Sequence, residues 1–250
     1  MNARERILAR LRAAPRQPDL SMPDVAGYYA ATARPSTPAA RLARFRTAIE
    51  AAHAEVFETT EADWPALLAR LCQEKGVVRL AYEPSAPLAR RLAPEPGLPG
   101  LQPFPASVED CKRALFDATD AGITAACGAI AETGTLVAWP GPTEPRTLSL
   151  VPPIHFVLLD AARICDDLHQ AMTDGRWAER LPTNLLLISG PSKTADIQQT
   201  LAYGAHGPKE LIVLLINQDP GARSQDSDPA SARSAQIFPE SCIPNPGSRT

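Results

Sequence analysis

The sequence predicts an α/β fold whose sheet is mostly parallel. Short runs of branched aliphatic residues alternate along the chain with segments whose apolar residues recur at helical spacing, which is the pattern of strand–helix–strand units. Hydrophobic residues make up 44% of the 250 residues but aromatic ones only 5%, so the core must be mainly aliphatic, as in parallel sheets. The stretch 185–216 has the pattern of one complete unit of this kind.

By composition the chain divides into three parts. Residues 1–36 contain Ile7, Leu8 and Leu11 at helical spacing, which predicts a docked N-terminal helix, followed by a proline-rich connector. Residues 37–216 carry the alternating pattern of the predicted α/β domain. Residues 217–250 are rich in Ser, Asp, Pro and Arg and hold few large apolar residues, which predicts a disordered tail.

The first half of the predicted domain begins where Thr37 caps a helix and Pro38 occupies its first position. The elements expected after this cap are a helix to about Ala52, a strand at 55–58, a helix from Asp63 to Gly76, a strand at 77–82, a proline-rich covering segment at 84–105 with a short helix at 88–92, and a helix at 107–116.

The second half opens with an apolar hairpin interrupted by a carboxylate. Residues 123–130 and 136–139 flank a polar turn that contains Glu132. Glu132 is either a solvent-exposed turn residue or a carboxylate in a crevice, where burial would raise its pKa and make it a base or nucleophile. Arg146 follows as a candidate second anion ligand, and a strand is expected at 155–159, in which His155 is interpreted as a core histidine.

The stretch 185–216 predicts a right-handed βαβ crossover with two parallel strands. Its first apolar run, 185–188, is continuous and is interpreted as a central strand buried on both faces. A polar loop leads to a helix expected from Ala195 to Tyr203, which Gly204 ends, and residues 211–216 form the second buried strand.

The loop after the first of these strands, Ser189 to Thr194, is a candidate anion site. Ligands of open α/β sheets collect beyond the carboxyl ends of the strands, where this loop would lie. The amides of the expected helix, together with Lys193, suit a carboxylate or phosphate; a capped turn with a solvated lysine is the alternative. A Walker A loop is excluded because Ser and Leu occupy its glycine positions.

His206, in a glycine-flanked turn, is favoured for a site role over a structural hydrogen bond.

Composition also argues against several classes of protein. A net charge of −3 does not suggest a nucleic-acid or membrane-surface partner. The five cysteines are far apart and odd in number, and they match no disulfide framework and no zinc or iron–sulfur spacing. No apolar run approaches the roughly 18–20 residues of a membrane span, and no signal-peptide region is evident. We therefore expect a cytoplasmic protein that binds no metal or redox cofactor of its own.

Four motifs give the chain a family resemblance. They are Ala131-Glu132-Thr133-Gly134-Thr135, the run Arg146, Ser149, Pro152 and His155, the segment Ser189-Gly190-Pro191-Ser192-Lys193-Thr194-Ala195-Asp196-Ile197, and Gly204-Ala205-His206-Gly207-Pro208. With them the chain resembles the lactate-utilization proteins of the LutC/YkgG type, which are built on the LUD domain. The resemblance is strong over about 120–216 and holds only in outline before it.

This resemblance implies an α/β/α sandwich like that of the glucosamine-phosphate deaminase, ribose-phosphate isomerase and CoA-transferase superfamily. It also implies a non-redox subunit for the oxidation of L-lactate to pyruvate, which acts with partner proteins that carry the iron–sulfur clusters. The sequence itself supports the non-redox role, because it has no Gly-x-Gly-x-x-Gly loop after a strand and no clustered cysteines that could serve an electron acceptor.

Residues and resemblance together give a set of candidate site residues. Catalytic roles are expected for Glu132 and His206, and ligand binding for Thr133, Gly134, Thr135, Arg146, Ser189, Gly190, Ser192, Lys193, Thr194 and Gly207. The Glu-Thr-Gly turn is similar to the turn that presents the catalytic glutamate of CoA-transferases. The alternative function is therefore a free-standing CoA-transferase-like or sugar-phosphate-isomerase-like enzyme that uses Glu132.

Overall fold

The structure, a computed structural model, describes residues 2–14, 23–32, 36–104, 119–141, 145–180, 184–195, 201–204 and 206–217. The chain groups into two units, Met1–Pro35 and Ser36–Thr250. The first unit contains α1 (Ala3–Ala13) and α2 (Val25–Thr32), and α1 begins with a capping box between Asn2 and Glu5. The expected N-terminal helix is present, while its docking and the three-part division of the chain stay predictions. The tail expected at 217–250 lies outside the described residues except for Asn217.

The second unit holds the remaining elements. Its helices are α3 (Pro38–Ala51), α4 (Trp64–Glu74), α5 (Ala89–Leu92), α7 (Arg146–Leu150), the 3-10 helix η1 (Ala161–Arg163), α8 (Leu168–Asp174) and α9 (Trp177–Arg180). Its strands are β1 (Glu55–Thr59), β2 (Arg79–Tyr82), β3 (Gly100–Pro103), β4 (Ala121–Ala125), β5 (Gly128–Ile130), β6 (Thr135–Ala138), β7 (Ile154–Asp160), β8 (Ile164–Cys165), β9 (Leu186–Ile188), β10 (Lys193–Ala195), β11 (Leu201–Tyr203) and β12 (Glu210–Ile216).

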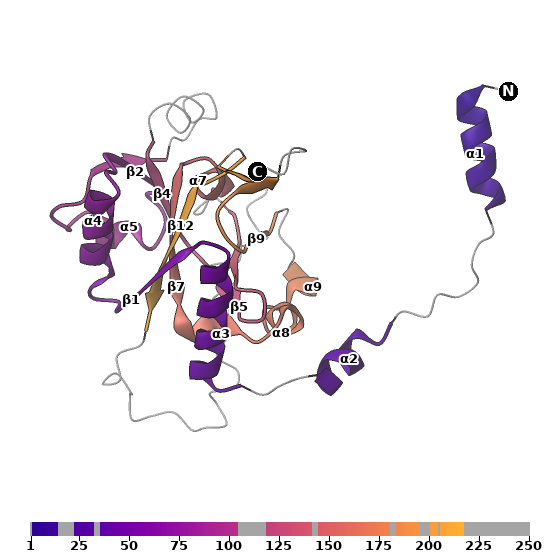
Figure 1. Ribbon diagram of the computed structural model, residues 1–250, viewed down its shortest axis with the longest axis horizontal. Coiled ribbons are helices and arrows are strands. Elements are labelled where there is room, and N and C mark those ends of the chain that lie inside the picture. The colour runs from indigo at the N-terminus through magenta and orange to yellow at the C-terminus, as the bar shows by residue number, and fades with distance from the viewer. Residues whose placement is uncertain are drawn as a thin grey trace. The chain divides into compact units, whose positions relative to one another are not determined.

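Among the described residues, six strands form a parallel sheet in the order β1-β12-β7-β4-β2-β3 (Figure 1). Consecutive side chains of β12 point to opposite faces: Ile212 and Leu214 join one hydrophobic cluster, whereas Leu211, Val213 and Leu215 join another. Both faces are thus buried, which is why this strand is a continuous aliphatic run. The predicted α/β class and mostly parallel sheet are confirmed.

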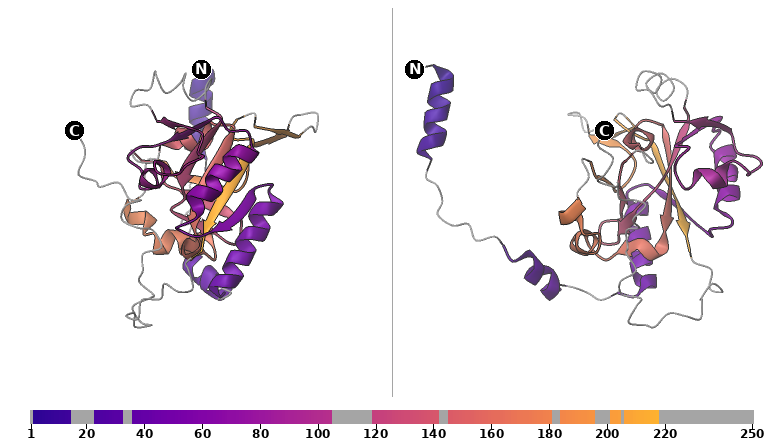
Figure 2. Two further views of the ribbon diagram at one scale, coloured as in Figure 1. Left: turned by 90° about the vertical axis from the view of Figure 1, so that its left-hand side faces the viewer. Right: turned by 180° about the vertical axis from the view of Figure 1, so that it is seen from behind.

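Helices cover both faces of this sheet (Figures 1 and 2). On one face Trp64 and Leu68 of α4 and Leu92 of α5 pack against the sheet through the first cluster. On the other face Phe45 and Ile49 of α3 pack against it through the second. The amphipathic spacing of these helices is therefore explained by the face that each one buries.

A second sheet lies beside α3, with the strand order β8-β5-β6-β9. The β5–β6 pair is the antiparallel hairpin that the sequence predicts around Glu132. β9 extends it antiparallel to β6, and β8 extends it parallel to β5. The side of this sheet that contains Trp139 is covered by Trp177 of α9, with the two rings in an edge-to-face contact. The sequence pattern predicted the hairpin, but not that β8 and β9 extend it into a separate sheet.

The prediction for the stretch 185–216 is only half right. β12 is the expected buried strand, but β9 belongs to the other sheet and lies at its edge, where Leu187 is 48% exposed. The two strands therefore form no βαβ crossover. The helix expected from Ala195 to Tyr203 is also wrong, because β10 and β11 pair antiparallel; residues 196–200 lie outside the described ones. A short apolar run fits a half-buried edge strand as well as a central one, and Ser, Lys and Thr suit a hairpin as well as a helix cap.

One arm of the expected hairpin, 123–130, is divided between two sheets, because 123–125 belong to β4 of the six-stranded sheet and only β5 pairs with β6. The remaining expected elements of the domain are present with small shifts in their ends, except for the helix expected at 107–116, which lies outside the described residues. The proline-rich segment 84–105 also contributes an edge strand, β3, that was not expected. In the part of the chain that the structure describes, no helix combines the length and the apolar character that crossing a membrane requires.

Candidate functional site

Three of the candidate residues come together through their hydroxyl groups. The Oγ1 atoms of Thr133 and Thr135 lie 2.7 Å apart, and Thr135 Oγ1 lies 2.8 Å from Ser189 Oγ. The pairing of β6 with β9 brings the third residue in, because Leu136 opposite Ile188 places Thr135 beside Ser189. Thr135 is buried, whereas Thr133 and Ser189 are exposed. We call these three residues the hydroxyl cluster.

Two glycines bring the turns of this cluster onto α3. Gly134 has φ +61°, and a Cβ at this position would lie 2.5 Å from the backbone nitrogen of Ile49. A Cβ at Gly190 would lie 2.8 Å from the carbonyl oxygen of Ala52, the residue that follows α3. Any side chain would push these turns away from the helix, so glycine is required at both positions. The candidate residues Gly134 and Gly190 thus have a clear local role.

Glu132 is at the tip of the β5–β6 hairpin and is exposed to solvent. Its side chain therefore matches the first of the two interpretations, a solvent-exposed turn residue. Its backbone is held nevertheless: the Glu132 N–H donates to the carbonyl oxygen of Asp166 at 3.0 Å, and the Ala131 N–H donates to that of Cys165 at 2.8 Å. The carboxylate is thus presented to solvent from a fixed backbone.

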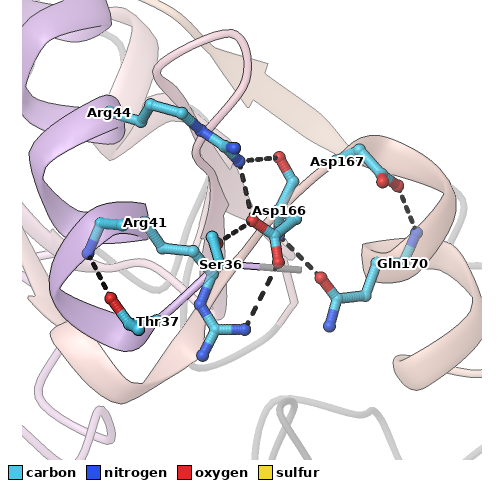
Figure 3. Close-up of polar contacts among 8 residues, drawn as sticks. Ser36, Thr37, Arg41, Arg44, Asp166, Asp167 and Gln170 are labelled. Carbon is cyan, nitrogen blue, oxygen red and sulfur yellow. Dashed lines mark hydrogen bonds and ion pairs between the residues drawn. The ribbon is translucent and has the colours of Figure 1, made fainter. Parts of the chain in front are cut away.

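Asp166 is the centre of a polar cluster between β8, α3 and α8 (Figure 3). Its carboxylate accepts hydrogen bonds from the Ser36 hydroxyl and from Arg44, the latter at 2.8 Å, and forms an ion pair with Arg41 at 3.6 Å. Its carbonyl oxygen accepts a further bond from Arg44 at 3.1 Å, and its N–H donates to Gln170 at 2.7 Å. All polar groups of Asp166 therefore have partners.

Sequence reasoning missed this cluster. Arg41 and Arg44 are spaced to share one face of α3, which is a detectable signal, but nothing in the sequence shows that Asp166 lies opposite them. Contacts between residues more than a hundred positions apart depend on the topology, and the topology of the second sheet was not predicted.

A different group of candidates is packed where β7 and β12 begin. The Ser192 N–H donates to the carbonyl oxygen of Pro208 at 2.8 Å, and a Cβ at Gly207 would lie 3.1 Å from that of Ser192. The N–H of Lys209, one residue before β12, donates to Pro153, one residue before β7. This group therefore lies beside the amino ends of the strands. The expectation that Ser189 to Thr194 lies beyond their carboxyl ends is wrong, because it assumed the βαβ crossover.

Arg146 is exposed at the start of α7, where its guanidinium donates to Asn184 Oδ1 at 3.3 Å. Asn184 precedes β9 and Ser189 follows it, so this contact lies at the end of β9 opposite the hydroxyl cluster. The described contacts therefore do not join Arg146 to the hydroxyl cluster, and its role as an anion ligand stays a prediction.

The remaining candidates lie on the hairpin and the turn after it. Lys193 is exposed at the start of β10, Thr194 pairs through its backbone with Ala202, and His206 is exposed before β12. Among the described contacts none links His206 to Glu132, which is held beside Asp166. Catalytic roles for these residues stay predictions, and the hydroxyl cluster with Glu132 is the part of the candidate site that the geometry brings together.

His155 is buried in the centre of the parallel sheet, as its interpretation as a core histidine requires. Its Nε2 lies 2.9 Å from Thr124 Oγ1, and burial lowers the pKa of His155 to about 3. The ring is therefore neutral at physiological pH.

Burial also raises the pKa of the thiols of Cys72 and Cys165 to about 12. Within the described ranges no three His, Cys, Asp or Glu residues are grouped so that they could hold a metal ion.

Comparison with known proteins adds a family and a related fold. The LUD domain family matches residues 42–216. The chain is 39% identical over 225 residues to protein NMB1437 of Neisseria meningitidis serogroup B, covering 88% of this chain and 95% of that protein. It is 34% identical over 115 residues to the lactate utilization protein C of Exiguobacterium sp., covering 44% of this chain and 50% of that protein. That match spans only half the length of the relative.

Among solved structures, the chain is similar to a DUF162 family protein from Deinococcus radiodurans. The two agree with a TM-score of 0.54 at 22% sequence identity, over 73% of this chain and 99% of that one. At this level of identity the likeness concerns the fold.

Proposed function

Because the chain belongs to the LUD domain family, we propose that it is a non-redox component of lactate utilization that binds a small carboxylate at the hydroxyl cluster beside Glu132. The name of the relative from Exiguobacterium supports the role in lactate utilization. The hydroxyl cluster supports the ligand class, and it is the observation that carries this part of the proposal.

The hydroxyl cluster has one proton more than its internal hydrogen bonds need. Each of the three hydroxyl groups has one proton to donate, and the two hydrogen bonds among them use two of the three. One proton is therefore free to donate to a ligand, and either partner of each bond can be the donor, so the free proton can sit at either end. The two ends, Thr133 and Ser189, are exposed. A 2-hydroxy acid matches this arrangement, since its carboxylate accepts and its hydroxyl can donate or accept.

Electron transfer is assigned to partner proteins. Oxidation of a 2-hydroxy acid requires a flavin, nicotinamide or metal acceptor, because no ordinary side chain takes up two electrons. The cysteines of this chain have no cluster-binding spacing. In the proposed assembly this chain holds or positions the carboxylate, and iron–sulfur proteins carry the electrons.

Calorimetric titration with L-lactate and with pyruvate tests the ligand. Ser189→Ala and Thr135→Val each remove one hydroxyl of the cluster, and we expect each to weaken binding about tenfold, the effect of one lost hydrogen bond. Thr173→Val, which removes an exposed hydroxyl on α8, is the matched control and should bind as the wild type does. Equal affinity in all four proteins would place the ligand elsewhere, and no binding to the wild type would refute the ligand class.

Reconstitution tests the partners. The purified chain with L-lactate and an artificial electron acceptor should show no reduction, and reduction should begin when iron–sulfur lactate-utilization proteins are added. Lactate-dependent reduction by the chain alone would contradict the non-redox role.

A second candidate function, a CoA-transferase-like enzyme, rests on the similarity of the Glu132-Thr133-Gly134 turn to that of CoA-transferases and on the fixed backbone of Glu132. The Glu132 carboxylate would attack the thioester carbonyl of an acyl-CoA and release CoA as the thiolate, and the thiolate would attack the glutamyl carbonyl of the mixed anhydride, giving a glutamyl thioester and the free acid. A second carboxylate would then take over the CoA by the same two steps in reverse, which regenerates Glu132. Mixing the protein with acyl-CoA donors and a carboxylate acceptor decides this candidate. The second candidate requires that the acyl-CoA of the acceptor is formed and that Glu132→Gln abolishes its formation. The first proposal expects no such product.

A further inference from the structure

The turn that carries Glu132 and Thr133 is held at both of its ends. Before it, the backbone N–H groups of Ala131 and Glu132 donate to the carbonyl oxygens of Cys165 and Asp166. After it, Gly134 lies against the backbone of α3 at Ala48 and Ile49. These two supports fix the backbone between them, so whatever sets the position of Asp166 relative to α3 also sets the backbone position of Glu132 and Thr133.

Arg44 connects the two supports. One of its terminal nitrogens donates both to the carboxylate of Asp166, at 2.8 Å, and to the carbonyl oxygen of the same residue, at 3.1 Å. That carbonyl oxygen is the one that accepts the Glu132 N–H, and an oxygen with two lone pairs can take both bonds. Arg44 and Ala48 are four residues apart, so they lie on the same face of α3. One face of the helix therefore contacts Asp166 through Arg44 and the turn through Ala48.

The remaining contacts of Asp166 keep it from moving independently. Arg41 and Ser36 approach the same carboxylate from the N-terminal part of α3 and the residues before it, and Gln170 accepts the Asp166 N–H from α8. Charged hydrogen bonds of this kind are about twice as strong as neutral ones. The polar cluster is partly buried, with 21% of the Asp166 side chain exposed, so solvent screens it less than a surface pair.

We infer that Arg44 and Asp166 are positioning residues of the candidate site: through one shared carbonyl oxygen they fix the turn that presents Glu132 and Thr133. The functional importance of this turn rests on the proposed function. The positioning itself can be tested without a ligand, because it predicts how firmly the Glu132 N–H is held.

Arg44→Gln is the direct test, and α3 offers a matched control in Arg46→Gln. Arg46 lies on the same helix, is about as exposed as Arg44, and forms ion pairs of the same length with Glu50 and Glu58, away from the turn. The first measurement is amide hydrogen exchange at 131–134 in the full chain. We expect Arg44→Gln to speed exchange of the Glu132 amide about tenfold, the effect of weakening one hydrogen bond, while the β12 amides stay as in the wild type. Arg46→Gln should leave the turn unchanged.

The second measurement is the affinity for L-lactate, which a merely structural role would not change. Arg44→Gln should weaken binding about fivefold or more, as the loss of a positioning contact does, and Arg44→Lys, which keeps the positive charge, should recover part of the loss. If Arg44→Gln does not fold, Ser36→Ala removes one contact of the Asp166 carboxylate and should produce the same two changes in weaker form.

The outcomes separate the two proposals. If both arginine variants alter exchange of the turn equally, or neither does, the inference is overturned. If Arg44→Gln loosens the turn but binds L-lactate like the wild type, the turn is held but the site does not depend on it, which also overturns the inference. If the wild type binds no L-lactate while exchange changes as expected, the proposed ligand fails and the positioning of Glu132 stands.

Discussion

The six-stranded and four-stranded sheets of the second unit differ at their edges and turns. The six-stranded sheet is buried on both faces by aliphatic side chains, and its inner strand β12 has buried residues from Leu211 to Leu215. The four-stranded sheet ends in the half-exposed β9. It packs on α3 through buried aliphatic residues such as Leu136 and Ile164, and its turns are held there by glycines and by the polar cluster around Asp166. The comparison shows where a site can form. A strand covered on both faces has no exposed side chain to offer a ligand, whereas the turns of the smaller sheet present hydroxyls and a carboxylate to solvent.

Removing a leucine from each sheet should give the largest difference. Leu214 is fully buried, so Leu214→Ala should lower the free energy of unfolding by about 2–5 kcal/mol. Leu187 on β9 is 48% exposed, and Leu187→Ala should change that free energy by no more than about 0.5 kcal/mol. Urea unfolding followed by circular dichroism measures both. Similar losses would mean that β9 is packed as firmly as β12.

The glycine contact of the smaller sheet can be separated from backbone strain with two alanines. Gly134 and Gly76 both have positive φ, +61° and +68°, so alanine costs about 1–2 kcal/mol of strain at either position. Only at Gly134 would the new Cβ meet α3; at Gly76 nothing lies within 4 Å. Gly134→Ala should therefore lower the free energy of unfolding more than Gly76→Ala and also weaken ligand binding. Equal losses would show that α3 moves away without cost.

The larger sheet should also respond to acid through His155. The unfolded chain takes up a proton at this ring near pH 6.5, whereas burial delays uptake in the folded chain to about pH 3, so protonation favours unfolding. In this window His155 should make the free energy of unfolding fall by about 1.4 kcal/mol per pH unit as the pH is lowered. His155→Gln keeps a hydrogen-bonding side chain but does not titrate, and its unfolding free energy should fall less steeply. Identical slopes would contradict the burial of the ring.

Each sheet also carries a buried thiol, which gives the smallest effect. Cys72 packs in the cluster under the larger sheet and Cys165 in the cluster behind the smaller one, and burial raises the pKa of both to about 12. Neither should react with iodoacetamide in the native protein near pH 8. As urea is added, Cys165 should be alkylated before Cys72 if the smaller sheet opens first. Simultaneous labelling, read by peptide mass spectrometry, would show that both sheets open together.

The same contrast explains how far the sequence could be interpreted. The larger sheet was predictable because a buried parallel strand is a continuous aliphatic run, as in β12, and because Thr37 and Pro38 mark the start of α3. β9 has a run of the same kind, yet it is an edge strand, because which sheet a short apolar strand joins depends on partners far along the chain. The false crossover followed from that one assignment.

The candidate site divides in the same way. The Glu132 turn and its hairpin could be predicted from the polar break between two apolar runs, and the contact of Thr135 with Ser189 joins two motifs of the family resemblance. The partners of Asp166 could not be predicted, because α3 and the strand β8 meet only once the second sheet is folded. Local patterns identify turns, whereas the residues that hold a turn in place come from elsewhere in the chain.

The central claim, that a small carboxylate binds beside the turns of the smaller sheet, is tested most directly by locating the ligand. Titration of the ¹⁵N-labelled protein with L-lactate, followed by amide chemical shifts, reports the position without any substitution. Binding at the hydroxyl cluster predicts that the largest changes fall on 132–136 and 188–190, with the amides of β12 unaffected. Changes confined to the surroundings of Arg146 or His206, or no changes at all, would contradict it.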